Sequence, residues 1–214
     1  HLLRLFLQKA LRSEKSTLLL LGVAALVCVR YYFSRGALHW SGDAAQHIVY
    51  VNITARALAQ FELPTWTFAI GTGSPYLQNY GFLFFYLAGL CTLITQDLDL
   101  GIKLCLACAH VLSGLGMYCF VHRLTHSRRA GFFAGLAYVL CFWHVQQVLL
   151  MGRLPLALFY SFMPFVFWAI EMLARPSYRV RAACGGALAL ACLFFTHPGY
   201  GTYAALSAAF YALV

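Results

Sequence analysis

The chain has 214 residues, of which 62% are hydrophobic and only 10% are charged, with a mean hydropathy of +0.75. A water-soluble domain cannot cover its surface with so few charges, so the composition excludes soluble, disordered and coiled-coil proteins. The net charge of +9 is then typical of the cytoplasmic loops of a membrane protein, and we expect no nucleic-acid partner. The sequence therefore predicts an all-α, polytopic bundle of transmembrane helices.

Residues 1–16 predict a basic amphipathic helix that lies on an anionic membrane surface. Apolar side chains share one helical face there, and the charge comes from Arg4, Lys9, Arg12 and Lys15. A cleaved signal peptide would have a shorter basic region before its apolar core. Because the chain begins at His1 and ends at Val214 inside an apolar run, we expect residues 17–214 to be the N-terminal part of a transmembrane domain, truncated at its C-terminus.

The apolar runs that follow set the membrane topology. They lie at 17–33, 81–95, 101–121, 130–150, 155–174, 182–195 and 201–214. The run at 81–95 is short, since a span needs about 20 apolar residues. If this run stays in the interface or is re-entrant, the arginine clusters at 123–129 and 175–181 join the basic N-terminus in the cytoplasm, as the positive-inside rule favours. Residues 34–100 then form a long external first loop.

This topology places most of the polar chemistry on the external side. The external loop holds four of the six acidic residues of the chain, and later turns bring Gln147, Arg153 and His197 to the same side. Of the two remaining acids, Glu171 stands four residues before Arg175, a spacing typical of an ion pair within a helix. The external side is therefore where a functional site is expected.

The external loop opens with a predicted amphipathic helix that begins at Asp43, directly after Gly42. Asp43 is placed as its N-cap or first-turn acid, and His47 lies one turn later on the same face. The helix ends before Pro64, which disfavours helical geometry in the preceding residue. On these residues alone, a helix cap without chemistry is the simpler interpretation of Asp43.

Several weak motifs occur in order through this loop. They are Gly42-Asp43 with His47, Pro64-Thr65-Trp66, Gly71-Thr72-Gly73-Ser74-Pro75, and the aromatic run from Tyr80 to Tyr86. Over residues 36–90 the chain resembles the first external loop of GT-C glycosyltransferases. It is most similar to the bacterial multi-pass family labelled pyruvoyl-tetrahydropterin-synthase-related. The resemblance implies a GT-C-like bundle in the bacterial cytoplasmic membrane, with an external site and a sugar donor carried on a polyprenyl phosphate within the membrane lipid.

The resemblance also implies a catalytic role for the acid at position 43, as general base or as metal ligand. Two features depart from the family pattern: Gly81 stands where relatives often have proline, and the loop around Arg153 has no second carboxylate. The missing second acid favours a base over a two-acid metal site, so we predict no metal ligands and leave the cofactor open. Inverting sugar transfer needs such a base and cations that hold the departing phosphate.

The predicted site therefore has one catalytic residue, Asp43, and a wider substrate-binding set. Arg153 suits phosphate because its planar donors engage two oxygens together. The remaining members of the set are His47, Arg56, Tyr80, Gln147 and His197. Two of these have open alternatives: His47 could orient Asp43, touch the acceptor or be an interfacial histidine, and His197 could be functional or only form a turn.

Other histidines give weaker signals. His110 and His144 could suggest haem ligation, but no paired pattern recurs on neighbouring spans. His122 and His126 are one turn apart, yet the surrounding arginines would repel a metal. A transporter or lipid flippase remains the main alternative function, and a non-catalytic scaffold is a third. Transporters usually show repeated halves and ionisable residues near the bilayer midplane, whereas the predicted spans of this chain are nearly free of acids and its external loop is unrepeated.

Overall fold

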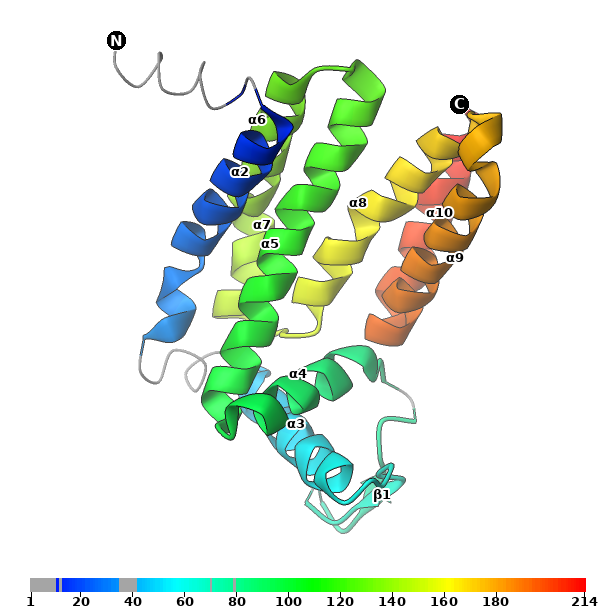
Figure 1. The fold of residues 1–214 in the computed structure, drawn as a ribbon. Coiled ribbons are helices and arrows are strands. Elements are labelled where there is room, and N and C mark those ends of the chain that lie inside the picture. The colour runs from blue at the N-terminus through cyan, green and yellow to red at the C-terminus, as the bar shows by residue number, and fades with distance from the viewer. Residues whose placement is uncertain (1–10, 12, 35–41, 70, 79) are drawn as a thin grey trace.

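The computed structural model of the chain describes residues 11, 13–34, 42–69, 71–78 and 80–214. Most of the predicted surface helix at 1–16 lies outside these residues. Long helices run up and down in one bundle (Figure 1). They are α2 (Glu14–Cys28), α5 (Leu98–Thr125), α6 (Arg128–Val139), α8 (Leu156–Leu173), α9 (Arg179–Thr196) and α10 (Pro198–Leu213). The predicted helical bundle is confirmed.

Among the described residues, four helical stretches are long and apolar enough to cross a membrane, as expected from the composition. They are Leu98–Thr125, Arg128–Leu150, Leu156–Leu173 and Pro176–Thr196. The first predicted span corresponds to α2 and the short 3₁₀ helix η1 (Arg30–Phe33), and the last corresponds to α10. Large apolar side chains on the outside of the bundle, such as those of Leu112, Phe133 and Leu188, are exposed, as expected for surfaces that face lipid.

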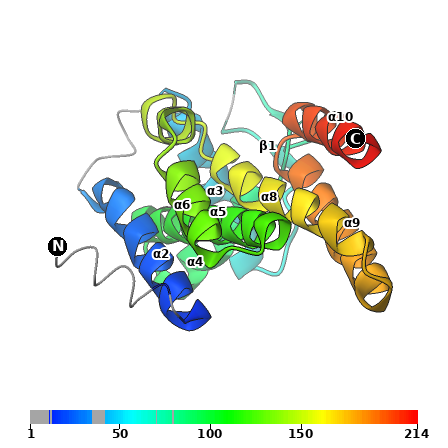
Figure 2. The same ribbon diagram turned by 90° about the horizontal axis from the view of Figure 1, so that it is seen from above.

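The helix α5 is the centre of the bundle. It packs against α2, α6 and α8, and α8 in turn packs against α9 and α10. Seen along the bundle, α8 separates α5 and α6 from α9 and α10 (Figure 2). Close approach of α5 and α6 depends on glycine, because a Cβ atom at Gly135 would lie 2.7 Å from the carbonyl oxygen of Gly114.

A separate layer covers one end of the bundle. It contains α3 (Ala44–Ala59), an antiparallel pair of short strands, β1 (Trp66–Thr67) and β2 (Ser74–Pro75), and α4 (Leu83–Thr95). The helix α4 has 13 residues and lies across the bundle axis, so it does not run alongside the spanning helices (Figure 1). This placement agrees with the prediction that the run at 81–95 is not a span. Fully buried Phe84 and Phe85 fix the layer to the bundle core.

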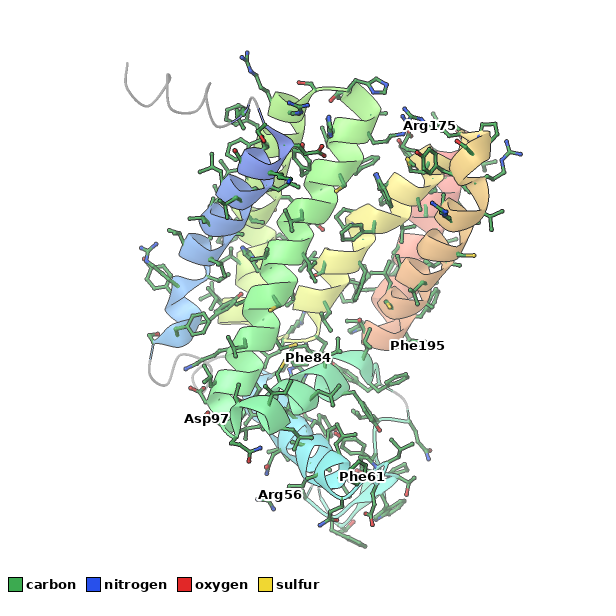
Figure 3. The ribbon with its side chains drawn as sticks, viewed as in Figure 1. Arg56, Phe61, Phe84, Asp97, Arg175 and Phe195 are labelled. Carbon is green, nitrogen blue, oxygen red and sulfur yellow. The ribbon has the colours of Figure 1, made fainter. Side chains whose placement is uncertain are left out.

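The two ends of the bundle differ in charge. Arg56, Phe61 and Asp97 lie at the end that carries this layer, which we call the loop end, and Arg175 lies at the opposite, arginine end (Figure 3). The turns between α5 and α6 and between α8 and α9 both lie at the arginine end. Both arginine clusters thus share one end, as the topology required. Which end faces the cytoplasm stays a prediction.

The connections between α6 and α8 are irregular. The helix α6 stops at Val139, and a short helix α7 (Phe142–Val145) leads into a π-helical segment, η2 (Gln146–Leu150). Between α8 and α9 lies the 3₁₀ turn η3 (Pro176–Tyr178). The predicted ion pair of Glu171 with Arg175 was wrong, because the Glu171 carboxylate instead accepts a hydrogen bond from the Tyr211 hydroxyl of α10.

Candidate functional site

A cavity of about 320 Å³ lies at the loop end, where four distant parts of the sequence meet. They are the start of α3, the segment before α4, the turn between η2 and α8, and the junction of α9 with α10. The residues that line the cavity are Asp43, Tyr80, Arg153, Pro155, Leu156, His197 and Tyr200. Four of the seven predicted site residues therefore share one cavity, although they are spread over more than 150 positions of the chain.

Asp43 occupies the N-cap position of α3 but makes no capping hydrogen bond with its side chain. The predicted N-cap position is therefore confirmed, but the side chain does not perform the capping. The carboxylate instead faces Arg153, with 3.7 Å between Asp43 Oδ2 and Arg153 Nε, and 60% of the Asp43 side chain is exposed. An aspartate that neither caps its helix nor is buried is available to a molecule in the cavity.

Backbone contacts fix the position of Asp43. Its amide nitrogen donates to the carbonyl oxygen of Met151 at 3.0 Å. The preceding Gly42 allows this approach, because a Cβ atom there would lie 2.4 Å from the same oxygen. The turn that carries Arg153 is thus attached directly to the start of α3. Gly42 explains how the two charged residues come to face each other.

Arg153 is held by Gln147 of η2. The Arg153 backbone nitrogen donates to the Gln147 carbonyl at 3.0 Å, and Nη1 donates to Gln147 Oε1 at 2.8 Å. Gln147 is buried and does not line the cavity, so it positions Arg153 and is not itself a substrate contact. The π-helical geometry of this segment is one that recurs at functional sites.

His47 contacts both Tyr80 and the turn that carries Arg153. Its Nδ1 lies 2.9 Å from the carbonyl oxygen of Gly152, and its Nε2 lies 3.3 Å from the Tyr80 hydroxyl. A carbonyl oxygen only accepts, so Nδ1 carries the proton and Nε2 of the neutral ring accepts from Tyr80. Burial lowers the pKa of His47, against the opposing effects of the Gly152 carbonyl and the Asp43 carboxylate. His47 therefore orients the Tyr80 hydroxyl and ties it to the Arg153 turn.

His197 forms the opposite wall as the N-cap residue of α10. Its Nδ1 accepts from the backbone nitrogen of Tyr200, so the neutral ring carries its proton on Nε2. Burial lowers the pKa of His197, and the charge of Arg153 lowers it further. The predicted turn-forming role of His197 and its place in the cavity are thus both observed.

Gly81 joins Tyr80 to this wall. A Cβ atom at Gly81 would lie 2.0 Å from the carbonyl oxygen of Thr196 and 2.8 Å from the backbone nitrogen of His197. The neighbouring Phe82 packs on Phe195, with 5.0 Å between ring centroids. A glycine after Tyr80 is therefore what this chain needs to seat the segment against the junction of α9 and α10.

One predicted site residue lies elsewhere. Arg56 is exposed near the far end of α3, thirteen residues beyond Asp43, and is not among the residues that line the cavity (Figure 3). Thirteen helical residues correspond to about 20 Å. Sequence reasoning also missed Tyr200, although it lies in the same Thr196–Gly201 segment as His197, where an interrupted helix was the available signal.

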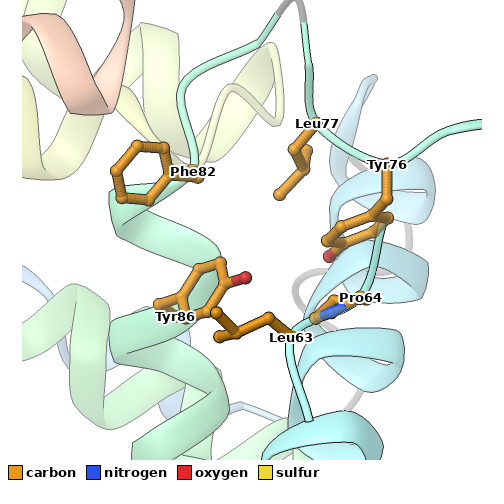
Figure 4. Close-up of a pocket in the computed structure, with 6 residues that line it drawn as sticks. All are labelled: Leu63, Pro64, Tyr76, Leu77, Phe82 and Tyr86. Carbon is orange, nitrogen blue, oxygen red and sulfur yellow. The ribbon is translucent and has the colours of Figure 1, made fainter. Parts of the chain in front are cut away.

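A second cavity of about 310 Å³ also lies at the loop end. Its lining is mainly apolar and aromatic and consists of Leu63, Pro64, Tyr76, Leu77, Phe82 and Tyr86 (Figure 4). The Tyr76 hydroxyl donates to the Tyr50 carbonyl at 2.7 Å, which ties this wall to α3. Residues on both sides of Tyr80 in the sequence, Leu77 and Phe82, thus line an apolar cavity, while Tyr80 itself lines the charged one.

The charged cavity contains one carboxylate, one guanidinium, a neutral imidazole and two phenols. Burial and the Asp43 carboxylate raise the pKa of Tyr80, so its hydroxyl keeps its proton at neutral pH. The described part of the chain contains no group of three or more His, Cys, Asp or Glu side chains that could hold a metal ion. The arrangement suits acid–base chemistry next to a bound anion.

Comparison with known proteins gives no relative for this chain. No protein-family model matches it, and no curated protein or solved structure matches it either.

Proposed function

We propose that this chain carries the active site of a membrane glycosyltransferase. It would move a sugar from a polyprenyl-phosphate-linked donor to an acceptor hydroxyl. The observation that supports this proposal most is the Asp43 carboxylate, which makes no cap and faces the Arg153 guanidinium across an open cavity. A carboxylate beside a cation is what inverting transfer from a sugar phosphate requires.

In the proposed reaction, Asp43 is the general base. The acceptor oxygen attacks the anomeric carbon and forms the new glycosidic bond, while its proton passes to Asp43. The bond between the anomeric carbon and the donor phosphate oxygen breaks, and the phosphate leaves with the electron pair. The exposure of Asp43 supports this role because an acceptor can reach the carboxylate.

Arg153 binds the phosphate in this proposal. Only its Nη1 is used by Gln147, and no acceptor for Nη2 is found among the described residues. The contact with Asp43 is long, at 3.7 Å, and 42% of the Arg153 side chain is exposed, so a phosphate can replace this weak pairing. The hydroxyl of Tyr200 is a further donor on the cavity wall, and the Tyr80 hydroxyl donates to His47.

The location of the cavity favours a transferase over a transporter or flippase. A transported substrate is usually bound near the bilayer midplane between repeated halves. This cavity lies between the loop-end layer and the ends of the bundle helices. With the arginine end in the cytoplasm, the proposed site is extracytoplasmic, and a lipid-linked donor reaches it from the bilayer. We place the protein in a bacterial cytoplasmic membrane on this basis and on the stated resemblance.

The test is sugar transfer from polyprenyl-phosphate donors by the full-length protein in lipid nanodiscs. Asp43→Asn removes the base, and general bases contribute on the order of 10²–10⁴ in rate. Glu62→Gln is the matched control, because Glu62 is also an exposed loop-end carboxylate but does not line the cavity. We expect transfer to collapse in the first variant and persist in the second. Normal transfer by Asp43→Asn would refute the proposal.

A further inference from the structure

Two cysteines meet where α4 packs on the first turns of α5. Cys105 of α5 is buried in the core at the loop end, and Cys91 of α4 packs against the same core and is partly exposed. Their thiols are hydrogen-bonded to each other, and both are reduced in the structure. The proposed transferase reaction uses neither residue, so this contact needs a separate explanation.

The helices α4 and α5 approach each other closely beside the two thiols. A Cβ atom at Gly101 would lie 2.6 Å from both the Cα atom and the backbone nitrogen of Thr92. Thr92 directly follows Cys91, and Cys105 lies one turn after Gly101 on the same face of α5. A disulfide requires Cα atoms no more than about 7 Å apart. The close crossing of the two helices is what allows two such short side chains to meet.

The connection between α4 and α5 holds the helices in this arrangement. Only Gln96 and Asp97 separate them, and Gln96 has a left-handed backbone with φ of 56°. The Asp97 side chain caps α5 by accepting from the backbone nitrogen of Leu100 at 2.8 Å. This short, capped turn keeps Cys91 and Cys105 together, which favours their reaction with each other over more distant cysteines.

The two thiols differ in reactivity. The hydrogen bond donated by Cys105 lowers the pKa of the Cys91 thiol, against the opposing effect of burial. The thiolate is the form that attacks a disulfide, and attack also requires access. Cys91 meets both conditions better than Cys105, because Cys105 is buried. Cys91 is therefore placed to react first and Cys105 to react second.

We propose that Cys91 and Cys105 form a disulfide bond in the native protein. The oxidant is itself a disulfide, carried by a protein or by a small molecule. The Cys91 thiolate attacks it, which releases one thiol and leaves a mixed disulfide, and Cys105 then displaces the second thiol. The S–S bond of the oxidant breaks and one S–S bond forms in the chain. The two protons lost by the cysteines end on the two released thiols.

The location of the pair suits such a bond. With the arginine end in the cytoplasm, as the positive-inside rule predicts, α4 and the first turns of α5 lie on the external side. Disulfides form and persist outside the cytoplasm and are rare within it. The bond would fix α4, and the segment with Tyr80 that precedes it, to the central helix of the bundle. The inference rests on the predicted topology and not on the proposed transferase activity.

The test uses the full-length protein in the membranes of cells that express it, prepared without a reducing agent. The membranes are dissolved in SDS with N-ethylmaleimide, which blocks free thiols before they can exchange, and the unreduced peptides are identified by mass spectrometry. We expect the peptide that contains Cys91 to be joined to the peptide that contains Cys105. Alkylation of both thiols throughout the sample would overturn the proposal, and this readout needs no variant.

Reduction of the purified protein in detergent gives a second readout. A bond that closes a loop of about 15 residues constrains the unfolded chain, so dithiothreitol should lower Tm by roughly 6–12 °C. Cys91→Ser should abolish both the cross-link and the response to dithiothreitol. The matched control is Cys108→Ser, because Cys108 is exposed one turn beyond Cys105 and should leave both unchanged. A cross-link that is lost in Cys108→Ser but survives in Cys91→Ser would overturn the proposal.

Discussion

Substitution of Gly81 by alanine tests whether the segment before α4 is seated against the junction of α9 and α10. A Cβ atom at this position would lie 2.0 Å from the Thr196 carbonyl oxygen, 2.3 Å from its carbonyl carbon and 2.8 Å from the His197 nitrogen. All three atoms belong to the backbone, so no side-chain rotation relieves the clash. The two segments must separate by about 1 Å or more before the contact becomes tolerable, and close-packed interiors resist such shifts.

The expected cost follows from this geometry. Overpacking of a buried site typically costs about 1–3 kcal/mol, and we expect Gly81→Ala to be near or above the upper end because backbone must move. Gly185→Ala in α9 is the matched control. A Cβ atom there meets nothing within 4 Å, and alanine in a helix is favoured over glycine by about 0.5–1 kcal/mol.

The assay is reversible unfolding of the full-length protein in mixed detergent micelles with increasing SDS. We expect Gly81→Ala to be destabilised and Gly185→Ala to be unchanged or slightly more stable. If Gly81→Ala unfolded at the same SDS concentration as the wild type, the segment would not be docked on Thr196. The described placement of Tyr80 beside His197 would then be refuted.

Three further predictions concern topology, phosphate binding and pH. In a chain without its native cysteines, Thr125→Cys should be labelled only from the cytoplasm and Glu62→Cys only from outside, and the reverse pattern would contradict the topology. Arg153→Lys keeps the charge but loses the planar pair of N–H groups, so the affinity for the sugar donor should fall roughly 10- to 100-fold with unchanged folding. If the variant bound the sugar donor as the wild type does, Arg153 would only anchor the chain at the membrane interface. Burial lowers the pKa of His47 in the folded protein, so as the pH falls the unfolded chain is protonated at His47 before the folded protein is. Stability should therefore be full above the ordinary histidine pKa of about 6.5 and decline below it, and His47→Asn should weaken this pH dependence in unfolding measurements.

Much of the fold could be predicted from composition and charge. The short length of the run at 81–95 and the arginine clusters together predicted that this run is not a span, and the structure has both basic turns at one end of the bundle. These features depend on local sequence and on the thickness of the bilayer. Helix ends were less predictable: the run at 130–150 hides the break after Val139, because the residues on both sides of it are apolar.

The candidate site was predictable in its members but not in its contacts. Asp43 and Tyr80 were predicted from the resemblance of the external loop, and Arg153 and His197 from their polarity on the same predicted side of the membrane. Two contacts could not be predicted: the hydrogen bond of Gln147 with Arg153, and the close approach of Gly42 to Met151. Both depend on the tertiary structure, which no local sequence pattern shows. Arg56 was included as a cation that could hold the departing phosphate, and its distance from Asp43 along α3 removes it from the cavity.

The contact of His110 with His144 inside the bundle, with 4.7 Å between ring centroids, shows the same limit. Each residue alone has the appearance of an isolated histidine in an apolar run, and 33 residues separate them in the sequence. Only the packing of α7 against the middle of the bundle brings the rings together.

The most direct test of the central claim is an experimental structure of the full-length protein in lipid with a bound polyprenyl-phosphate sugar. The account predicts that the phosphate lies within hydrogen-bond distance of the Arg153 guanidinium. It also predicts that the Asp43 carboxylate faces the anomeric carbon from the side opposite to the leaving oxygen. A donor bound elsewhere, with Asp43 and Arg153 still paired to each other in an otherwise empty cavity, would contradict the account.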